Sequence, residues 1–82
     1  MLKELRSREK VIGVKQSRRA IREGRARQVF LACDADPVLT EPLLAQCREK
    51  TVPVDRGCTM RELGQAAGIQ VGASVVVLLA GE

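Results

Sequence analysis

The run Gln28-Val29-Phe30-Leu31-Ala32-Cys33 decides the fold of this 82-residue chain. It is apolar almost throughout and follows a turn, which is typical of a strand covered on both faces of a sheet. A second apolar run, Val75–Ala80, predicts another buried strand, over Ser74–Ala80. The run is far shorter than the ~20 residues that a membrane-spanning helix needs. The short segments Val11–Val14 and Val52–Val54 predict two more strands. Pro53 puts the latter near a sheet edge, because proline cannot donate to a central ladder.

Helical patterns lie between these strands. A first short helix is expected over Leu2–Arg8, and a second over Lys15–Gly24, where Gly24 stops the helix. A third runs to about Lys50, capped by Asp36 before Pro37 or starting later, at Thr40 before Pro42. Small residues recur at intervals of three and four in the second helix and form its packing face: Ser17, Ala20, Ile21 and Gly24. The inner face expected for the third helix consists of Leu39, Leu43, Leu44 and Cys47.

The last predicted helix has a capping box, because Thr59 and Glu62 have the spacing at which each side chain satisfies the other residue's backbone amide. This helix should continue through Ala67 and stop at Gly68, and the segment Ile69–Val71 should then form a short exposed bridge. Helix and strand thus alternate along the whole chain. This order predicts an α/β fold, a three-layer α-β-α sandwich around one small, mostly buried mixed sheet. A chain of this length has room for one modest core, which excludes an enzyme with an interdomain cleft.

Charge is concentrated in the first 30 residues, which hold ten basic and three acidic side chains, whereas the remaining 52 hold four basic and seven acidic ones. Such polarity indicates a positive face directed at a polyanion, either nucleic acid or an anionic membrane, unless the basic end is merely solvated. Lys15, Arg19 and Arg22 line up along one side of the second helix. Membrane binding is disfavoured because Ala20 and Ile21 are the only apolar residues of this helix, which leaves little to insert into a membrane.

The residue types that most catalytic and metal sites require are missing. The chain has no histidine, so a Cys-His nucleophile is unavailable and a zinc site is not expected. The carboxylates of Asp34 and Asp36 suit turn formation and capping better than catalysis. Cys33 and Cys47 lie in apolar runs and are expected in the core, and an odd number of cysteines suits reduced thiols in a cytoplasm. We therefore expect a cytoplasmic, non-catalytic protein with no metal, cofactor or small-molecule substrate.

Nucleic acid remains as the expected partner, and the scarcity of aromatic residues restricts how it is bound. Single-strand binders stack bases on aromatic rings, but this chain has a single phenylalanine, in a strand that should be buried. Contact should instead come from a polar helix start, where backbone amides and basic side chains meet phosphates and base edges. Gly13, immediately before the second helix, would let a nucleic acid approach the backbone closely.

Four separate segments resemble one family: Gly13–Arg19 (GVKQSRR), the following Gly24, Asp34–Pro37 (DADP) and Leu63–Gly72 (LGQAAGIQVG). They resemble the kink-turn RNA-binding superfamily that includes large-subunit ribosomal proteins seven-Ae and thirty-e, and especially its small bacterial members. The resemblance covers essentially the whole chain and implies one kink-turn RNA-binding domain over residues 1–82. A kink-turn is a sharply bent RNA helix with tandem sheared G·A pairs beside a three-nucleotide bulge.

In that family a motif at a helix start reads the G·A pairs, and a loop before the last strand covers the extruded bulge nucleotides. The resemblance places Gly13, Lys15, Gln16 and Arg19 at the motif's glycine, asparagine, glutamate and lysine. Gln16 can still accept a hydrogen bond but lacks the carboxylate's charge, and Lys15 adds a charge without an acceptor. Base readout should therefore weaken and salt dependence steepen. The expected RNA-binding residues are Gly13, Lys15, Gln16, Arg18, Arg19, Arg22, Ile69, Gln70 and Val71.

Two alternatives stay open at this point. Ile69 and Val71 could shelter a base face, with Gln70 between them, or could form a small apolar plug under the last strand. The basic face could bind an acidic protein instead of RNA, which would make the chain a protein-interaction module on the same fold. We expect a monomer whose RNA is ribosomal or a structured regulatory RNA.

Overall fold

The computed structural model describes residues 9–80, so the helix expected over Leu2–Arg8 lies outside the described residues. Strands and helices alternate along the described chain. In order they are β1 (Lys10–Ile12), α2 (Val14–Arg22), β2 (Ala26–Leu31), α3 (Pro37–Lys50), β3 (Val54–Asp55), α4 (Met60–Ala67) and β4 (Val75–Leu79).

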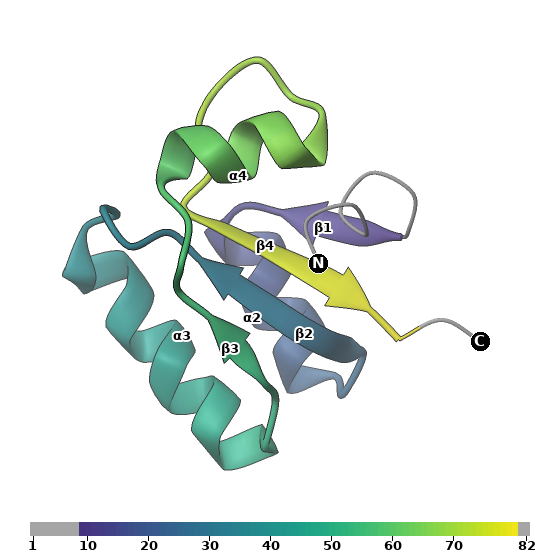
Figure 1. Ribbon diagram of the computed structural model, residues 1–82. Coiled ribbons are helices and arrows are strands. Elements are labelled where there is room, and N and C mark those ends of the chain that lie inside the picture. The colour runs from purple at the N-terminus through teal and green to yellow at the C-terminus, as the bar shows by residue number, and fades with distance from the viewer. Residues whose placement is uncertain (1–8, 81–82) are drawn as a thin grey trace.

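The four strands form one mixed sheet in the order β1-β4-β2-β3 (Figure 1). β4 is antiparallel to both of its neighbours, β1 and β2, whereas β3 is parallel to β2. Val29 of β2 is in register with Val77 of β4 on one side and with Val54 of β3 on the other. β3 is an edge strand, as the proline before it predicts.

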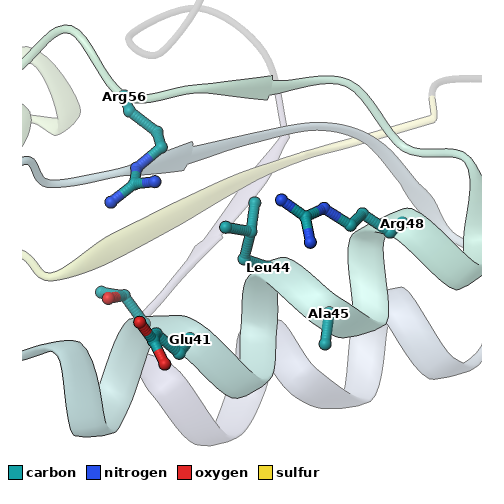
Figure 2. Close-up of a pocket in the computed structure, with 6 residues that line it drawn as sticks. Glu41, Leu44, Ala45, Arg48 and Arg56 are labelled. Carbon is teal, nitrogen blue, oxygen red and sulfur yellow. The ribbon is translucent and has the colours of Figure 1, made fainter.

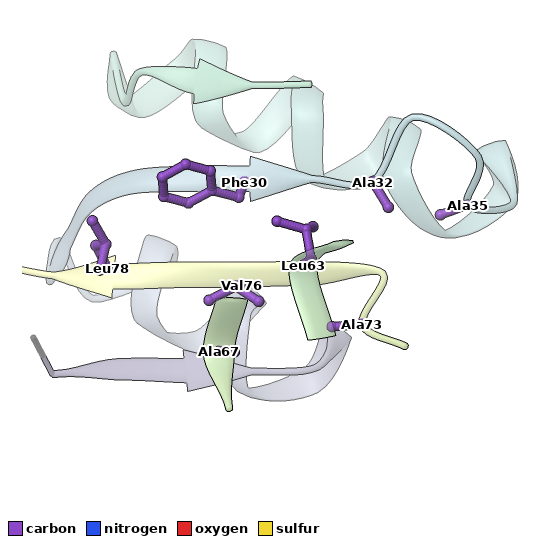
Figure 3. Packing of buried hydrophobic residues seen from close by; sticks show 8 residues of the cluster. All are labelled: Phe30, Ala32, Ala35, Leu63, Ala67, Ala73, Val76 and Leu78. Carbon is purple, nitrogen blue, oxygen red and sulfur yellow. The ribbon is translucent and has the colours of Figure 1, made fainter. Parts of the chain in front are cut away.

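Helices cover both faces of this sheet, which confirms the α-β-α sandwich. On one face α2 and α3 pack on the sheet through a cluster that includes Ile21, Leu43 and Val77. On the other face α4 contributes Leu63 to a cluster around Phe30 (Figure 3). Each fully buried side chain of this size stabilises the fold by about 1.5–3 kcal/mol relative to leaving it exposed.

The helix starts follow local rules that the sequence displays. The Asp36 carboxylate accepts a hydrogen bond from the backbone amide of Val38 at 2.9 Å, which confirms Asp36 as the cap of α3. Thr59 and Glu62 form the expected capping box at the start of α4. Asp34 also caps this helix, because its carboxylate accepts from the Met60 amide at 2.8 Å. Asp36 therefore has the capping role that its position suggests, whereas Asp34 caps a helix that is distant in the sequence.

Cys33 corrects one expectation about the core. It is exposed rather than buried, because β2 ends at Leu31 and Cys33 lies in the turn that leads to α3. Its amide donates to the carbonyl of Cys58 at 2.8 Å, so the backbone is paired although the side chain faces solvent. Cys47 is fully buried, as expected.

The inner face of α3 also differs from the expected one. Thr40, Leu43 and Cys47 are buried, whereas the Leu39 residue is 41% exposed. Successive helical residues point about 100° apart, so with Thr40 facing the sheet Leu39 is turned toward the edge of the contact. Leu44 is half-buried. Thr40 is thus a packed residue inside the helix and not an alternative start.

Several element boundaries are shifted by a few residues. The first strand ends at Ile12 instead of Val14, because Gly13 has a φ of 102° and Val14 already opens α2. That helix ends at Arg22, and Gly24 follows the cap residue Glu23 with a left-handed φ of 75°, which agrees with its expected role as the helix stop. Gly24 is exposed, however, and is not part of the packing face. β2 covers residues 26–31 instead of 28–33, β3 covers 54–55 instead of 52–54, and β4 covers 75–79 instead of 74–80.

Candidate nucleic-acid interface

The start of α2 is an open helix end. Gly13 precedes it with a left-handed φ of 102°, a conformation in which other residues are strained. Its amide donates to the carbonyl of Val75 at 3.1 Å, which ties the helix start to β4. No side chain of residues 9–80 caps α2, and its first turn contains no acidic residue. The first amides of the helix are therefore open to an outside acceptor, at the positive end of the helix dipole.

The exposed side of α2 is charged along its length, and the opposite side is buried. Ser17, Ala20 and Ile21 pack inward, as their spacing predicts. An open hollow of about 660 Å³ lies over the outward side. Its lining contains five of the nine expected RNA-binding residues together with one carboxylate: Lys15, Gln16, Arg18, Arg19, Arg22 and Glu23.

Glu23 reduces the positive charge of this side and orients one arginine. Its carboxylate accepts from Arg19 Nε at 3.2 Å and from Arg25 Nε at 2.9 Å. These hydrogen bonds, first that from Arg19, hold the pKa of Glu23 below its usual range, so it is ionised at neutral pH. The side chain of Arg19 remains 66% exposed, and within residues 9–80 its outer N–H groups have no hydrogen-bond acceptor. Sequence reasoning missed this pair, although its i, i+4 spacing was a usable signal.

The loop over residues 68–72 is closed against α4 by backbone contacts. The amides of Gly68 and Ile69 donate to the last carbonyls of the helix, and the amide of Ala73 donates to the carbonyl of Met60 at 3.0 Å. A Cβ on Gly64 would overlap the carbonyl oxygen of Val71, so only glycine lets the loop lie this close to the helix. The loop is therefore held in place although it has no secondary structure of its own.

The two apolar side chains of this loop point in different directions. Ile69 is half-buried and packs against the cluster around Phe30, which agrees with the plug alternative. Val71 is 70% exposed, and Gln70 is exposed as well. The expected exposed bridge therefore holds for Gln70 and Val71 but not for Ile69. Val71 alone offers an apolar side chain that a ligand can cover fully.

The fold brings the start of α2 and the loop to one end of the sheet (Figure 1). β4 starts where the loop ends, and its first residue, Val75, accepts the hydrogen bond from Gly13. Arg22 lies seven residues beyond Lys15, roughly 10 Å further along the helix axis. The basic side chains of α2 and the exposed Val71 of the loop therefore lie toward the same end of the sheet, whereas Ile69 packs inward.

Two further hollows flank α3. One, of about 330 Å³, lies between α2 and α3, where Gln46 Nε2 donates to the carbonyl of Arg18 at 3.1 Å. The other, of about 320 Å³, lies on the opposite flank of α3 (Figure 2) and includes Arg48 and Arg56. Sequence reasoning singled out neither arginine, because they become neighbours only through the packing of α3 beside β3.

The remaining chemistry of the described residues is sparse. Burial raises the pKa of the Cys47 and Cys58 thiols, so both are protonated at neutral pH. Nowhere in residues 9–80 do three or more potential metal ligands gather. The described helices also include none that is long and apolar enough to cross a membrane.

Comparison with known proteins places the chain among named relatives. Residues 1–82 match the model of the ribosomal protein L7Ae/L30e/S12e/Gadd45 family. An RNA-binding protein of Geobacillus sp. (strain WCH70) is 40% identical over 77 residues, which are 94% of each chain. RNA-binding protein YbxF of Geobacillus stearothermophilus is 46% identical over 69 residues, 84% of each chain.

Solved structures have the same fold. The Giardia lamblia 15.5kD RNA binding protein superposes with a TM-score of 0.88 at 25% identity, covering 99% of this chain and 69% of that one. A protein of unknown function from Bacillus halodurans superposes with a TM-score of 0.87, also at 25% identity, covering 98% of this chain and 84% of that one.

Proposed function

Because the chain belongs to the ribosomal protein L7Ae/L30e/S12e/Gadd45 family, we propose that it is a non-catalytic RNA-binding protein that recognises kink-turns. RNA binding is supported by the family and by the relatives that are named RNA-binding proteins. The finer statement, recognition of the tandem G·A pairs and the bulge of a kink-turn by one domain over residues 1–82, rests on the motifs and on the geometry of the site.

The observation that carries this proposal is that the start of α2 and the loop over residues 68–72 lie toward the same end of the sheet. Each side suits one part of a kink-turn. A helix start with open amides and basic side chains suits the polar edges and phosphates around the G·A pairs. An exposed apolar side chain on a fixed loop suits an unstacked base, whose faces are apolar.

On the helix side, Lys15 and Arg19 contact phosphates, and Gln16 accepts hydrogen bonds from guanine edges through its amide oxygen. Gly13 lets the RNA backbone approach because no side chain stands in front of the first amides. Arg18 and Arg22 extend the phosphate contacts along α2. Base readout by Gln16 is weaker than readout by a carboxylate, so a larger share of the affinity is electrostatic.

On the loop side, Val71 covers the face of an extruded nucleotide, and Gln70 beside it donates or accepts at that nucleotide's polar edge. Ile69 contributes indirectly, since its contact with the core cluster holds the loop in position. The protein acts as a monomer in the cytoplasm, and its RNA is a ribosomal or regulatory kink-turn.

A fluorescence titration tests this proposal. The protein is titrated against a kink-turn RNA and against a version in which Watson–Crick pairs replace both G·A pairs, each at two salt concentrations. The expected result is tight binding to the kink-turn and weak, strongly salt-dependent binding to the control. Equal binding to both RNAs would mean that the basic face binds polyanions without reading structure, and would overturn the kink-turn proposal.

A further inference from the structure

The hollow on the far flank of α3 contains two arginines, Arg48 and Arg56, and one carboxylate, that of Glu41. It has a volume of about 320 Å³ (Figure 2). Arg48 comes from the last turns of α3, and Arg56 follows β3. Neither arginine forms an ion pair with a carboxylate of residues 9–80, whereas Arg19 and Arg25 both do. Both side chains belong to exposed residues and are accessible to a ligand.

The lining of the hollow suits one chemical class. Figure 2 shows the guanidinium groups of Arg48 and Arg56 on either side of Leu44, which with Ala45 supplies the apolar part of the surface. Planar guanidinium groups match phosphate oxygens with paired N–H donors. Glu41, two turns before Arg48 on α3, cannot bind a phosphate, but its carboxylate can accept from a hydroxyl group. A phosphate followed by a sugar with a free hydroxyl group can bind the arginines and Glu41 together. RNA provides that unit at every nucleotide.

The position of the hollow links it to the interface on α2. The hollow over the outward side of α2 shares Arg18 and Arg22 with the groove between α2 and α3. That groove in turn shares Ala45 with the hollow of Arg48 and Arg56. Packed helix axes lie about 8–10 Å apart, so only a few nucleotides separate the two ends of this path. A strand that leaves the α2 surface can therefore reach the second arginine pair.

We propose that Arg48 and Arg56 form a second phosphate site for the same RNA, outside the kink-turn itself, and that Glu41 accepts from a ribose 2′-hydroxyl there. This inference rests on the proposed function, because an RNA seated on α2 brings the phosphate to the hollow. The site extends the contact of the protein from the kink-turn to one of the stems that flank it.

The test compares the salt dependence of binding to two kink-turn RNAs, one with short stems and one with stems longer by about ten base pairs. For each contact with a phosphate, the slope of log K against log salt concentration changes by about 1. The variants Arg48→Gln and Arg56→Gln should each reduce the slope by about 1 on the long RNA and leave it unchanged on the short one.

The matched control is Arg27→Gln. It removes the same charge from an exposed residue of β2, near the sheet end where β2 starts and β4 finishes. This variant should leave both slopes unchanged. A second arm replaces ribose by deoxyribose in the added stem, which should weaken binding by the wild type but not by Glu41→Ala. Melting temperatures of all variants should match that of the wild type, since every substituted residue is exposed.

Two results would overturn the inference. In the first, Arg48→Gln and Arg56→Gln behave like Arg27→Gln on the long RNA. In the second, they bind RNA normally but lose binding to poly-glutamate, which would assign the hollow to an acidic protein partner. Failure of the proposed function can be distinguished from these two results. It would appear with the wild type alone, as equal binding to the short kink-turn RNA and to its Watson–Crick control.

Discussion

The two halves of the proposed interface lie toward the same end of the sheet but are built in opposite ways. The start of α2 is open: no described side chain caps it, and its outward residues are polar or charged. The loop over residues 68–72 is closed: backbone hydrogen bonds and the contact of Val71 with Gly64 hold it against α4. Its freely exposed apolar side chain is that of Val71.

This difference separates two contributions to binding. Groups on α2 act through charge and hydrogen bonds, so their effects should depend strongly on salt. The loop acts through its shape and one apolar contact, so its effects should depend on whether it stays in place and should vary little with salt. Substitutions in the two halves should therefore differ in the slope of affinity against salt as well as in affinity.

The largest effect is expected from the basic residues of α2. Lys15→Ala and Arg19→Ala should each weaken kink-turn binding by roughly tenfold or more, because each removes a charge-assisted hydrogen bond to the RNA. The salt slope should fall with each substitution. Thermal stability should change by less than about 0.5 kcal/mol, since both residues are exposed. Arg27→Ala is the control, and normal binding by both α2 variants would show that the assigned site is wrong.

Gly64→Ala should displace the loop over residues 68–72 although it changes no exposed side chain of the interface. The added Cβ would overlap the carbonyl oxygen of Val71, so the loop must move away from α4. Such overpacking costs about 1–3 kcal/mol, partly offset by the better helix propensity of alanine. A lower melting temperature and weaker binding with an unchanged salt slope are expected. Gln65→Ala, at the next and exposed position, should change neither quantity.

A smaller effect should separate the two apolar residues of the loop. Val71→Ser should weaken kink-turn binding by about fivefold, as expected from the loss of about 1 kcal/mol of apolar contact. It should leave the melting temperature unchanged, because Val71 is 70% exposed. Ile69→Ser should instead lower the melting temperature, since Ile69 packs on the core cluster. If Ile69→Ser weakened only binding and Val71→Ser lowered only stability, the roles would be reversed: Ile69 would contact the RNA and Val71 would pack on the core.

The smallest effect is expected at Glu23, whose carboxylate holds Arg19. Glu23→Gln should strengthen RNA binding by about twofold, the scale of an exposed i, i+4 ion pair, and should steepen the salt slope. Because the pKa of Glu23 is lowered, the wild-type pair is intact above the usual carboxyl pKa and is lost only as the pH falls through the lowered value. The ratio of the two affinities should thus be constant between about pH 6 and pH 8.

Glu9→Gln is the control for this prediction. It changes the net charge equally at an exposed residue whose carbonyl accepts from Leu79, at the far end of β4 from Val75. If Glu9→Gln strengthened binding as much as Glu23→Gln, the effect would come from net charge and not from Arg19.

Local signals predicted much of this fold. Asp36, the capping box of Thr59 and Glu62, and Gly68 act within a few residues of their own position, so their roles can be inferred from spacing alone. The buried strands were also predictable from their apolar runs. The strand order β1-β4-β2-β3 depends on contacts between distant segments, which no local pattern specifies. The prediction that Cys33 is buried was wrong because an apolar run does not reveal at which residue the chain leaves the sheet.

The site was predictable only in part. The periodicity of α2 predicted its charged side, and the resemblance to a family predicted that the loop belongs to the candidate site. Neither shows that Ile69 turns inward while Val71 turns outward, because that depends on how the loop lies against α4. The contact between Gly64 and Val71, and the neighbourhood of Arg48 and Arg56, likewise arise from packing between elements.

The central claim is that the start of α2 and the loop over residues 68–72 bind the same RNA. The most direct measurement is an NMR titration of ¹⁵N-labelled protein with a kink-turn RNA, following backbone amides and the side-chain amides of Gln16 and Gln70. The account predicts that the largest shifts cluster at residues 13–22 and 68–72 and saturate together at one equivalent of RNA. Shifts that leave both segments unchanged and cluster elsewhere, for example at the start of β2, would contradict it.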